Sequence, residues 1–326
     1  MFGRLFLGEL KKLFKVKTVI IFTAFIIVLL FIALIAYGTD IFPELDAKKY
    51  NESELKNELM NLKLTLQIAN SAGSMVANEE KQLIKNKILV LEYIKENELY
   101  DQSLHLNGED EQLFSRTAET ATSTIMEILI VAVVIYGLVL GASAIASEIK
   151  DGTMKLVLLR PLTRNQLVGA KLLATVTYVV AVHMCVFILC LILSHIVYEK
   201  DQTKTLYLFN SSVVYLAPRS ALIGISYFVT LLSLLSKTVL AFSIGTITRN
   251  RIIGIAVPLL EPILASMLSI LNTTVRNLSF SVVIQWFDFF TVINTNNFYV
   301  SFPMLILYIG GLILGAFIVF KKRDIS

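Results

Sequence analysis

The feature that most constrains this chain is a series of apolar runs, each long enough to cross a lipid bilayer. A helix that crosses a hydrocarbon core of about 30 Å needs about 20 consecutive apolar residues. Only 17% of the residues are charged, whereas a soluble domain has about a quarter. The sequence therefore predicts an all-α polytopic membrane protein with six transmembrane helices, at 18–37, 124–146, 166–197, 221–247, 252–271 and 301–320.

The distribution of charge between the loops predicts how the chain is oriented. An even number of spans places both termini on one side, and that side carries 15 basic and four acidic residues. The opposite side carries 13 basic and 19 acidic residues. Because short loops rich in Lys and Arg remain in the cytoplasm, we expect both termini there. The prediction is a multi-pass protein of the cell membrane, with a cytoplasmic tail at 321–326.

Residues 1–17 have the pattern of a short basic amphipathic helix. Arg4, Lys11 and Lys15 share one helical stripe. The apolar stripe consists of Phe2, Phe6, Leu10 and Leu13. Such a helix is expected to lie in the plane of the lipid headgroups and to lead into the first span. An alternative interpretation is that it only anchors the topology.

Residues 38–123, on the predicted outer side, have the pattern of a helical hairpin. Apolar residues recur at heptad spacing in two stretches, which are Leu55, Leu59, Leu62, Leu66 and Ala69, and then Ile84, Ile88 and Leu91. Asn78 can cap a second helix that starts at Glu79. We expect an extracellular hairpin whose apolar stripes pack together and whose charged faces are solvated, although its length would also suit a vestibule for a partner or substrate.

Two other segments on the outer side are predicted to lack a transmembrane helix. Residues 198–220 are predicted to be an outer loop, and residues 272–300 a re-entrant or interfacial segment. The second prediction depends on clustered aromatic residues, Trp286, Phe287, Phe289 and Phe290, which fit poorly in a watery loop but well at a membrane interface.

The stretch SEIKDGTMKLVLLRPLTRNQLVGAK, residues 147–171, places seven charged side chains between two apolar runs. Thr163 and Gln166 form a capping-box pattern, so a helix is expected to start at Arg164. Pro161 disfavours helix at the residue before it. The pattern predicts a short cytoplasmic helix at about 153–160, with Thr153 a possible cap, within a segment at 147–165. A loop that only fixes the membrane topology needs no capped helices, so we expect another protein to dock there.

This segment resembles the one that follows the second span in membrane subunits of type-2 ABC exporters. The resemblance rests on Glu148, Gly152, Thr153, Leu158, Pro161, Arg164 and Lys171, and it extends to the amphipathic amino terminus, six spans and aromatic elements before the last span. It implies that the short helix, which includes Leu156, is a coupling helix on a cytoplasmic ATPase. Glu148 and Arg164 would help to hold that joint, and residues 1–17 would be the elbow helix. Residues 38–123 are longer than in compact family members.

The resemblance also implies partner proteins. The sequence supports this independently, because it lacks a nucleotide-binding motif. No G-x-x-x-x-G-K-[ST] motif occurs, so no P-loop can bind the phosphates of a nucleotide. The chain is thus expected to be a non-catalytic subunit that binds no cofactor. ATP and Mg would be held by two separate cytoplasmic ABC ATPase subunits. A second copy of the permease, or a homologous permease, would complete the assembly in the lipid bilayer, and no nucleic acid is expected to bind.

Two charges fall inside the predicted spans. Lys237 precedes Arg249 by twelve residues, and Glu261 follows it by the same number. In an antiparallel helical hairpin both would lie about 15–18 Å from the inner face, where an unpaired charge costs about 2.5–3.5 kcal/mol. We expect a Lys237–Glu261 pair, either a packing contact or part of a polar site between protomers. Pro258 and Pro262 flank Glu261, so a kink or break is expected there.

The remaining candidate side chains favour structural roles. Cys185 and Cys190 are five residues apart in one span and so lie on different helix faces, which disfavours a disulfide and a metal site. His183, a lone histidine within a span, is expected to be a packing residue.

The leading functional interpretation is therefore an exporter permease that moves an amphipathic or hydrophobic cargo outward, such as an antimicrobial peptide, an antibiotic or a lipid-like molecule. One alternative is a self-contained secondary transporter or channel that uses Lys237 and Glu261. Another is an ATPase-coupled sensor of extracellular ligand. An intramembrane enzyme is disfavoured, because neither H-E-x-x-H nor G-x-S-x-G occurs.

Overall fold

The structure is a computed structural model, in which the described residues are 2–15, 17–38, 51–71, 78–100, 104–106, 117–159, 162–200, 204–209, 211–218, 220–271 and 298–322. The aromatic residues Trp286, Phe287, Phe289 and Phe290 lie outside the described residues, as does Pro161. Helix α6 is described by its backbone at Leu156 and Leu158, whose side chains are also outside the description.

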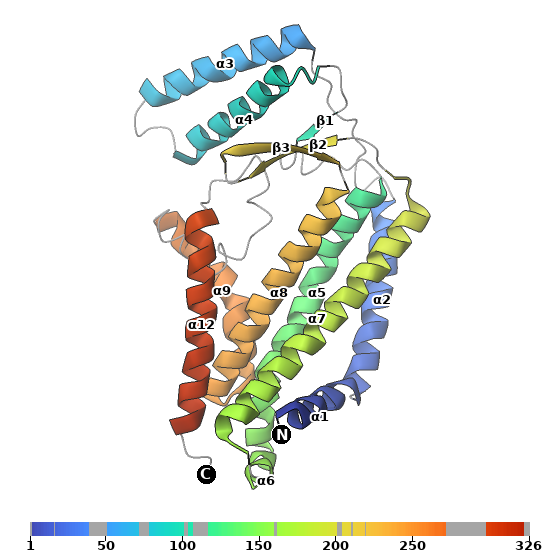
Figure 1. Cartoon of the computed structure of the whole chain (residues 1–326), viewed down its shortest axis with the longest axis vertical. Coiled ribbons are helices and arrows are strands. Elements are labelled where there is room, and N and C mark those ends of the chain that lie inside the picture. Colours follow the sequence, from blue (N-terminus) through green and yellow to red (C-terminus); the bar gives the residue numbers. More distant parts are fainter. Residues whose placement is uncertain are drawn as a thin grey trace.

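Six long helices stand side by side and form a bundle (Figure 1). They are α2 (Lys17–Tyr37), α5 (Ala118–Lys150), α7 (Arg164–Val197), α8 (Ala221–Thr248), α9 (Arg251–Leu271) and α12 (Phe298–Lys322). All six apolar runs of the sequence are thus helical over their described residues.

Within the described residues, four helices are long and apolar enough to cross a membrane. By length and composition they are the segments Ala118–Lys150, Arg164–Val197, Ile223–Thr248 and Phe302–Lys322. The described apolar part of α2, Ala24–Tyr37, is shorter. The all-α, membrane-spanning character of the bundle agrees with the sequence analysis, and the number of six spans stays a prediction.

Helices α5 and α8 pack most closely, through glycines that bring their backbones together. A Cβ on Gly141 of α5 would lie 2.6 Å from the carbonyl oxygen of Thr238 on α8, and one on Gly245 of α8 would lie 2.7 Å from the carbonyl oxygen of Ala142. Small residues allow such close approach between helices in a membrane, where packing replaces the hydrophobic effect as the driving force. The α5–α8 pair is therefore the centre of the bundle.

One end of the bundle, which we term the sheet end, carries two helices and a small sheet (Figure 1). Helices α3 (Glu52–Ser71) and α4 (Asn78–Glu96) pack together. The sheet consists of β1 (Leu104–Leu106), β2 (Lys204–Phe209) and β3 (Val213–Pro218), with β1 parallel and β3 antiparallel to β2. Between β2 and β3, Lys204 lies opposite Pro218 and Phe209 lies opposite Val213.

The core of the sheet end combines the two heptad stripes with strand residues. Leu55, Leu59, Ile88 and Leu91 are buried in one cluster, to which Leu206 and Leu208 of β2 also belong. The heptad spacing correctly predicts the stripes of α3 and α4, but residues 198–220, which are expected to be a loop, contain β2 and β3. The two strands in this range were not predicted because neither KTLYLF nor VVYLAP alternates apolar and polar residues, which is the pattern that indicates a half-buried strand.

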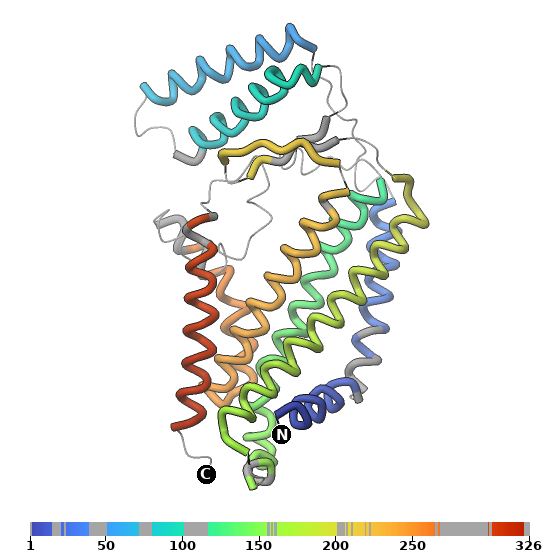
Figure 2. Tube along the Cα trace, viewed as in Figure 1, coloured from blue at the N-terminus to red at the C-terminus, as the bar shows by residue number. Residues whose placement is uncertain are grey.

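The opposite end of the bundle, which we term the α6 end, carries two short helices and both chain termini (Figure 1). Helix α1 (Phe2–Lys15) lies across the bundle at an angle to the long helices, as the trace in Figure 2 shows, and packs against α7. Helix α6 (Thr153–Leu158) lies beyond the end of α5. The predicted apolar stripe of α1 is half-buried at Phe6, Leu10 and Leu13, and exposed at Phe2.

Candidate functional site

The residue before the first turn of α6 is a glycine because the backbone there is left-handed. Gly152 has φ 68°, a conformation that costs other residues about 1–2 kcal/mol. Thr153, considered as a cap in the sequence analysis, is instead the first helical residue, and its hydroxyl donates to the carbonyl oxygen of Glu148 at 3.3 Å. This bond joins the start of α6 to the end of α5.

The capping box predicted at the start of α7 is confirmed. The Thr163 hydroxyl accepts a hydrogen bond from the backbone N–H of Gln166 at 3.2 Å. The Gln166 side-chain oxygen accepts from the backbone N–H of Thr163 at 3.2 Å. Helix α7 therefore starts at Arg164, and the direction of the chain is fixed on both sides of α6.

Helix α6 is attached to the bundle by a buried methionine. Met154 is fully buried in an apolar cluster, which we term the α6 cluster. Buried residues of four long helices contribute to it, namely Ile145 of α5, Leu167 and Val168 of α7, Phe242 of α8 and Phe320 of α12, and Leu5 of α1 packs against it. The residue that follows α6, Leu159, is 81% exposed. The segment thus has one side inside the bundle and an apolar side chain outside it.

Four charged side chains from α1, α5 and α7 form an ion-pair network beside the α6 cluster. The Lys171 ammonium, whose side chain is 3% exposed, lies 2.9 Å from Glu9 Oε2 and 2.7 Å from Glu148 Oε1. The Lys12 ammonium lies 2.8 Å from the same Glu148 oxygen and 3.5 Å from Glu9 Oε1. The network, composed of Glu9, Lys12, Glu148 and Lys171, joins the surface helix α1 to two long helices.

The network also raises the pKa of its most exposed member, Lys12. Burial disfavours the charged form of Lys12, but its hydrogen bond to Glu148 and the negative charge of Glu9 outweigh this and raise the pKa of Lys12. Lys12 therefore remains an ammonium under all ordinary conditions. Two carboxylates and two ammonium groups balance in charge, which reduces the cost of burying them.

The resemblance suggested that Glu148 and Arg164 hold a joint with a partner, and the structure places both against this chain. Glu148 faces Lys12 and Lys171 in the network. The Arg164 guanidinium donates to the carbonyl oxygen of Lys321, at the end of α12, at 3.1 Å. A cation at a helix carboxyl end satisfies free carbonyl groups and the helix dipole. Both residues thus connect the helices against which α6 packs.

Glu9, Lys12 and Met154 were missed as site residues by the sequence analysis. A signal for Glu9 was available, because it is the only acidic residue among residues 1–17. A lone acid in a basic membrane-surface helix is unfavourable next to anionic lipid unless it has a partner. Its partner is separated from it by 162 residues of sequence.

Lys237 and Glu261 lie on α8 and α9, which pack against each other. Both side chains are half-buried. Helix α9 continues through Pro258 and Pro262, so the expected kink or break is not a break, and a kink at that level stays a prediction. The two prolines are four residues apart on one helix, where the lost backbone hydrogen bonds fall on one face. A contact role or a cargo role for this pair stays a prediction.

His183 is fully buried on α7 and packs against α8. One ring nitrogen lies 3.3 Å from the Thr230 hydroxyl, and the ring stacks on Tyr227 with centroids 5.3 Å apart. These contacts agree with the packing role expected from the sequence.

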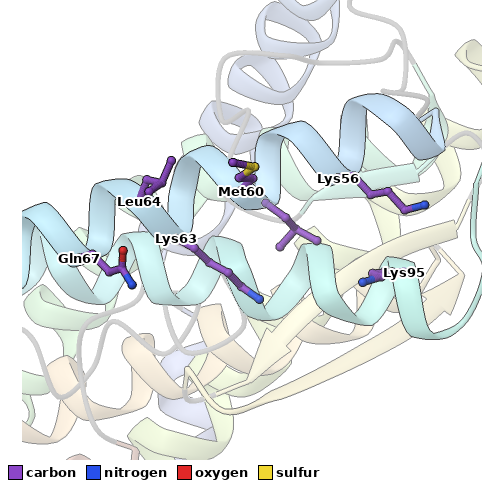
Figure 3. A pocket seen from close by; sticks show the side chains of 7 residues that line it. Lys56, Met60, Lys63, Leu64, Gln67 and Lys95 are labelled. Carbon is purple, nitrogen blue, oxygen red and sulfur yellow. The ribbon is translucent and has the colours of Figure 1, made fainter.

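At the sheet end, α3 and α4 form a groove with basic and apolar side chains (Figure 3). Its volume is about 390 Å³, and its lining includes Lys56, Met60, Lys63, Leu64 and Lys95. Two of these lysines have carboxylate neighbours, since Lys56 pairs with Glu52 and Lys63 lies 2.7 Å from Glu92. The groove therefore combines apolar contact area with exposed cations.

A comparison with known protein families now decides the class of this protein. The sequence profile described as ABC-2 family transporter protein matches residues 5–325, a range that includes the network, α6 and all the long helices. The chain belongs to the ABC-2 transporter family. No curated protein matches the chain at a significant level of similarity.

As an ABC-2 permease, the protein is a multi-pass membrane protein and the transmembrane, non-catalytic subunit of an ABC transporter. Permeases of this family normally work with ATPase subunits. The functional question for this permease is therefore where such a subunit attaches, and the α6 end is the candidate.

Proposed function

We propose that this permease is the membrane-spanning subunit of an ATP-driven exporter, and that α6 with its flanking residues docks on a cytoplasmic ATPase. The observation that carries the proposal is that this segment is buried on one side and exposed on the other. Met154 is buried in the α6 cluster with residues from four long helices, while Leu159 is 81% exposed. A segment that is anchored inside and apolar outside suits the transfer of motion from a partner.

The packing of the α6 cluster supports this transfer. Because side chains in a protein interior are close-packed, displacement of one member moves its neighbours. A pull on α6 would act on α5 through the Thr153–Glu148 hydrogen bond and on α7, α8 and α12 through Met154. Movement of these helices could then open a path across the membrane.

The residues proposed to contact the ATPase are Gly152, Thr153, Leu156, Leu158, Leu159 and Pro161. Leu156, Leu158 and Pro161 belong to this set by the family resemblance alone. Glu148, Arg164 and Lys171 act behind the contact, since each binds within this chain. ATP and Mg would be held by two ATPase subunits, and a second permease would complete the transporter.

The proposed cargo is amphipathic or hydrophobic, such as an antimicrobial peptide, an antibiotic or a lipid-like molecule, moved outward. The bundle supports this class because its long helices are apolar and present few charges, with Lys237 and Glu261 as the deepest of the described ones. In the proposed orientation the α6 end is cytoplasmic and the sheet end is extracellular, which follows from the excess of basic residues near α1 and α6.

Co-purification with the cognate ATPase tests the docking proposal. Leu159→Asp places a charge on the exposed residue beside α6 and is expected to abolish co-purification with the permease. The matched control is Ile252→Asp, since Ile252 is an aliphatic residue that is 72% exposed at the start of α9. We expect the control to retain the ATPase. Retention by both variants, with the permease still folded, would contradict docking at α6.

A second candidate function is ligand sensing at the sheet end, coupled to the same ATPase. The groove between α3 and α4 favours it, because three lysines and two exposed apolar side chains line one space of about 390 Å³. Transport and sensing are separated by assay in vesicles. Vesicles that contain an exporter accumulate cargo when ATP is added. A sensor changes the rate of ATP hydrolysis when ligand is added but moves no cargo.

A further inference from the structure

Strand β3 lies at one edge of the small sheet. The strand order is β1-β2-β3, so β3 pairs with β2 on one side and with no described strand on the other. In an antiparallel ladder, alternate residues direct their backbone N–H and C=O groups to the same side. About half of the backbone groups of β3 therefore point away from β2.

The free edge of β3 lacks the features that normally prevent further strand pairing. Edge strands are usually protected by charged side chains, by prolines or by covering elements. The sequence of β3, VVYLAP, carries no charge, and its single proline is the last residue. Val213 and Tyr215 are 43% and 53% exposed. The strand thus presents an apolar edge of the kind to which another strand can be added.

The orientation of the sheet follows from what its two faces contact. Val214 and Leu216 pack against the core of the sheet end, to which Leu91 and Ile94 of α4 belong. The residues that alternate with them point to the opposite face. In Figure 1 the strands run across the bundle, between α4 and the ends of the long helices. The direction perpendicular to the sheet therefore runs along the bundle.

This orientation suits a second copy of the chain as the added partner. Two identical strands that pair antiparallel are related by a twofold axis perpendicular to their sheet. Here that axis would run along the long helices, so both copies would stand upright in one membrane with the same ends on the same side. A twofold contact brings a surface against itself, and β3 has no charge that would repel its own copy.

The symmetry and the proline together select the register of the pair. An axis perpendicular to the sheet leaves every residue on its own face, so odd-numbered residues pair with odd-numbered ones. The axis must then pass through a residue and not between two. With the axis at Tyr215, the whole of Val213–Ala217 pairs with itself, and Pro218, which has no N–H, stays outside the ladder.

We propose that β3 pairs with β3 of a second copy across a twofold axis at Tyr215, which joins the two three-stranded sheets into one. The inference rests on the proposed function in one respect, since it takes the second permease to be a second copy of this chain. Because β3 leads directly into α8, the joined sheet links α8 of one copy to α8 of the other at the sheet end.

Disulfide trapping in the full-length permease tests the proposal. Tyr215→Cys is made in a background of Cys185→Ala and Cys190→Ala, which removes the native thiols. Membranes are oxidised and analysed by non-reducing electrophoresis. Opposite residues of an antiparallel pair have Cα atoms about 4.5–5.5 Å apart, a separation that a disulfide spans. We expect a covalent homodimer from Tyr215→Cys.

The matched control is Val213→Cys, on the same face of the same strand. In the proposed register its two copies are offset by four residues, which is about 14 Å and too far for a disulfide. We expect no covalent dimer from this variant alone. Addition of Ala217→Cys to the control places cysteines directly opposite each other and should produce the dimer.

Native electrophoresis of the same samples separates this proposal from the proposed function. A dimer with no Tyr215→Cys disulfide would overturn the β3 contact and leave the second permease in place. Equal disulfides from Tyr215→Cys and Val213→Cys would also overturn it, because random collision does not depend on register. A disulfide to a different protein would overturn the second copy as the occupant. A monomer without a disulfide would overturn both the contact and the second permease.

Discussion

At the scale of single residues, Lys171 is the most constrained charge of the α6 end. It is almost fully buried, and it holds carboxylates from two other helices. Removal of one partner from a buried pair is more damaging than its presence is stabilising, because a charge is left uncompensated. Without Lys171, the Glu9 and Glu148 carboxylates would face each other with only the exposed Lys12 ammonium between them.

We therefore predict that Lys171→Met destabilises the permease by about 3 kcal/mol. Thermal unfolding in detergent measures the effect. The control is Lys56→Met on α3, whose ion pair with Glu52 lies on the surface and is expected to contribute little. An equal change in melting temperature for the two variants would show that burial of the network adds nothing to stability.

At the scale of helices, the central contact is the glycine-mediated packing of α5 on α8. Gly137 and Gly141 are four residues apart on α5, a small-xxx-small spacing that is typical of close helix pairs in membranes. The Gly141 position has no room for a methyl group, since the nearest backbone oxygen would be 2.6 Å away. Gly310 on α12 is the opposite case, because nothing described lies within 4 Å of a Cβ placed there.

We predict that Gly141→Ala destabilises the bundle by about 1–3 kcal/mol, the usual cost of overpacking. Gly310→Ala should be neutral or slightly stabilising, since alanine favours a helix more than glycine does. The two variants differ from the parent by the same single methyl group, so a comparison of their melting temperatures isolates the helix contact. The same loss in both would contradict a special role for the α5–α8 contact.

How much of these elements could be predicted from sequence depends on how local their signals are. The long helices follow from apolar runs, and the start of α7 follows from Thr163 and Gln166, because both patterns are contained in a few neighbouring residues. The β2–β3 pair could not be predicted because its two segments do not alternate apolar and polar residues. The ion-pair network could not be predicted because Lys171 and Glu9 are 162 residues apart, and no pattern within either helix indicates the other.

At the scale of the whole molecule, the two ends of the bundle differ in charge and in the elements they carry. The α6 end has the basic helix α1 and both termini, and the sheet end has α3, α4 and the strands (Figure 1). If short basic loops remain in the cytoplasm, the sheet end is extracellular. Glu9, Lys12 and Arg164 would then all act at the cytoplasmic face.

We predict that Asn61→Cys, on the exposed face of α3, reacts with a membrane-impermeant maleimide in intact cells. Asp151→Cys, an exposed position just before α6, should react only after the cells are permeabilised. Both variants are made in a background of Cys185→Ala and Cys190→Ala, which removes the two native thiols. The reverse labelling pattern would invert the orientation and remove α6 from reach of any cytoplasmic ATPase.

Crosslinking is the most direct measurement of the proposed attachment of the ATPase at α6. A photo-reactive amino acid is placed at Leu159 in the permease–ATPase complex, and in a second sample at Ile252. We predict that irradiation of the Leu159 sample produces a covalent adduct with the ATPase and that the Ile252 sample produces little. Adducts from Ile252 with none from Leu159 would contradict docking at α6.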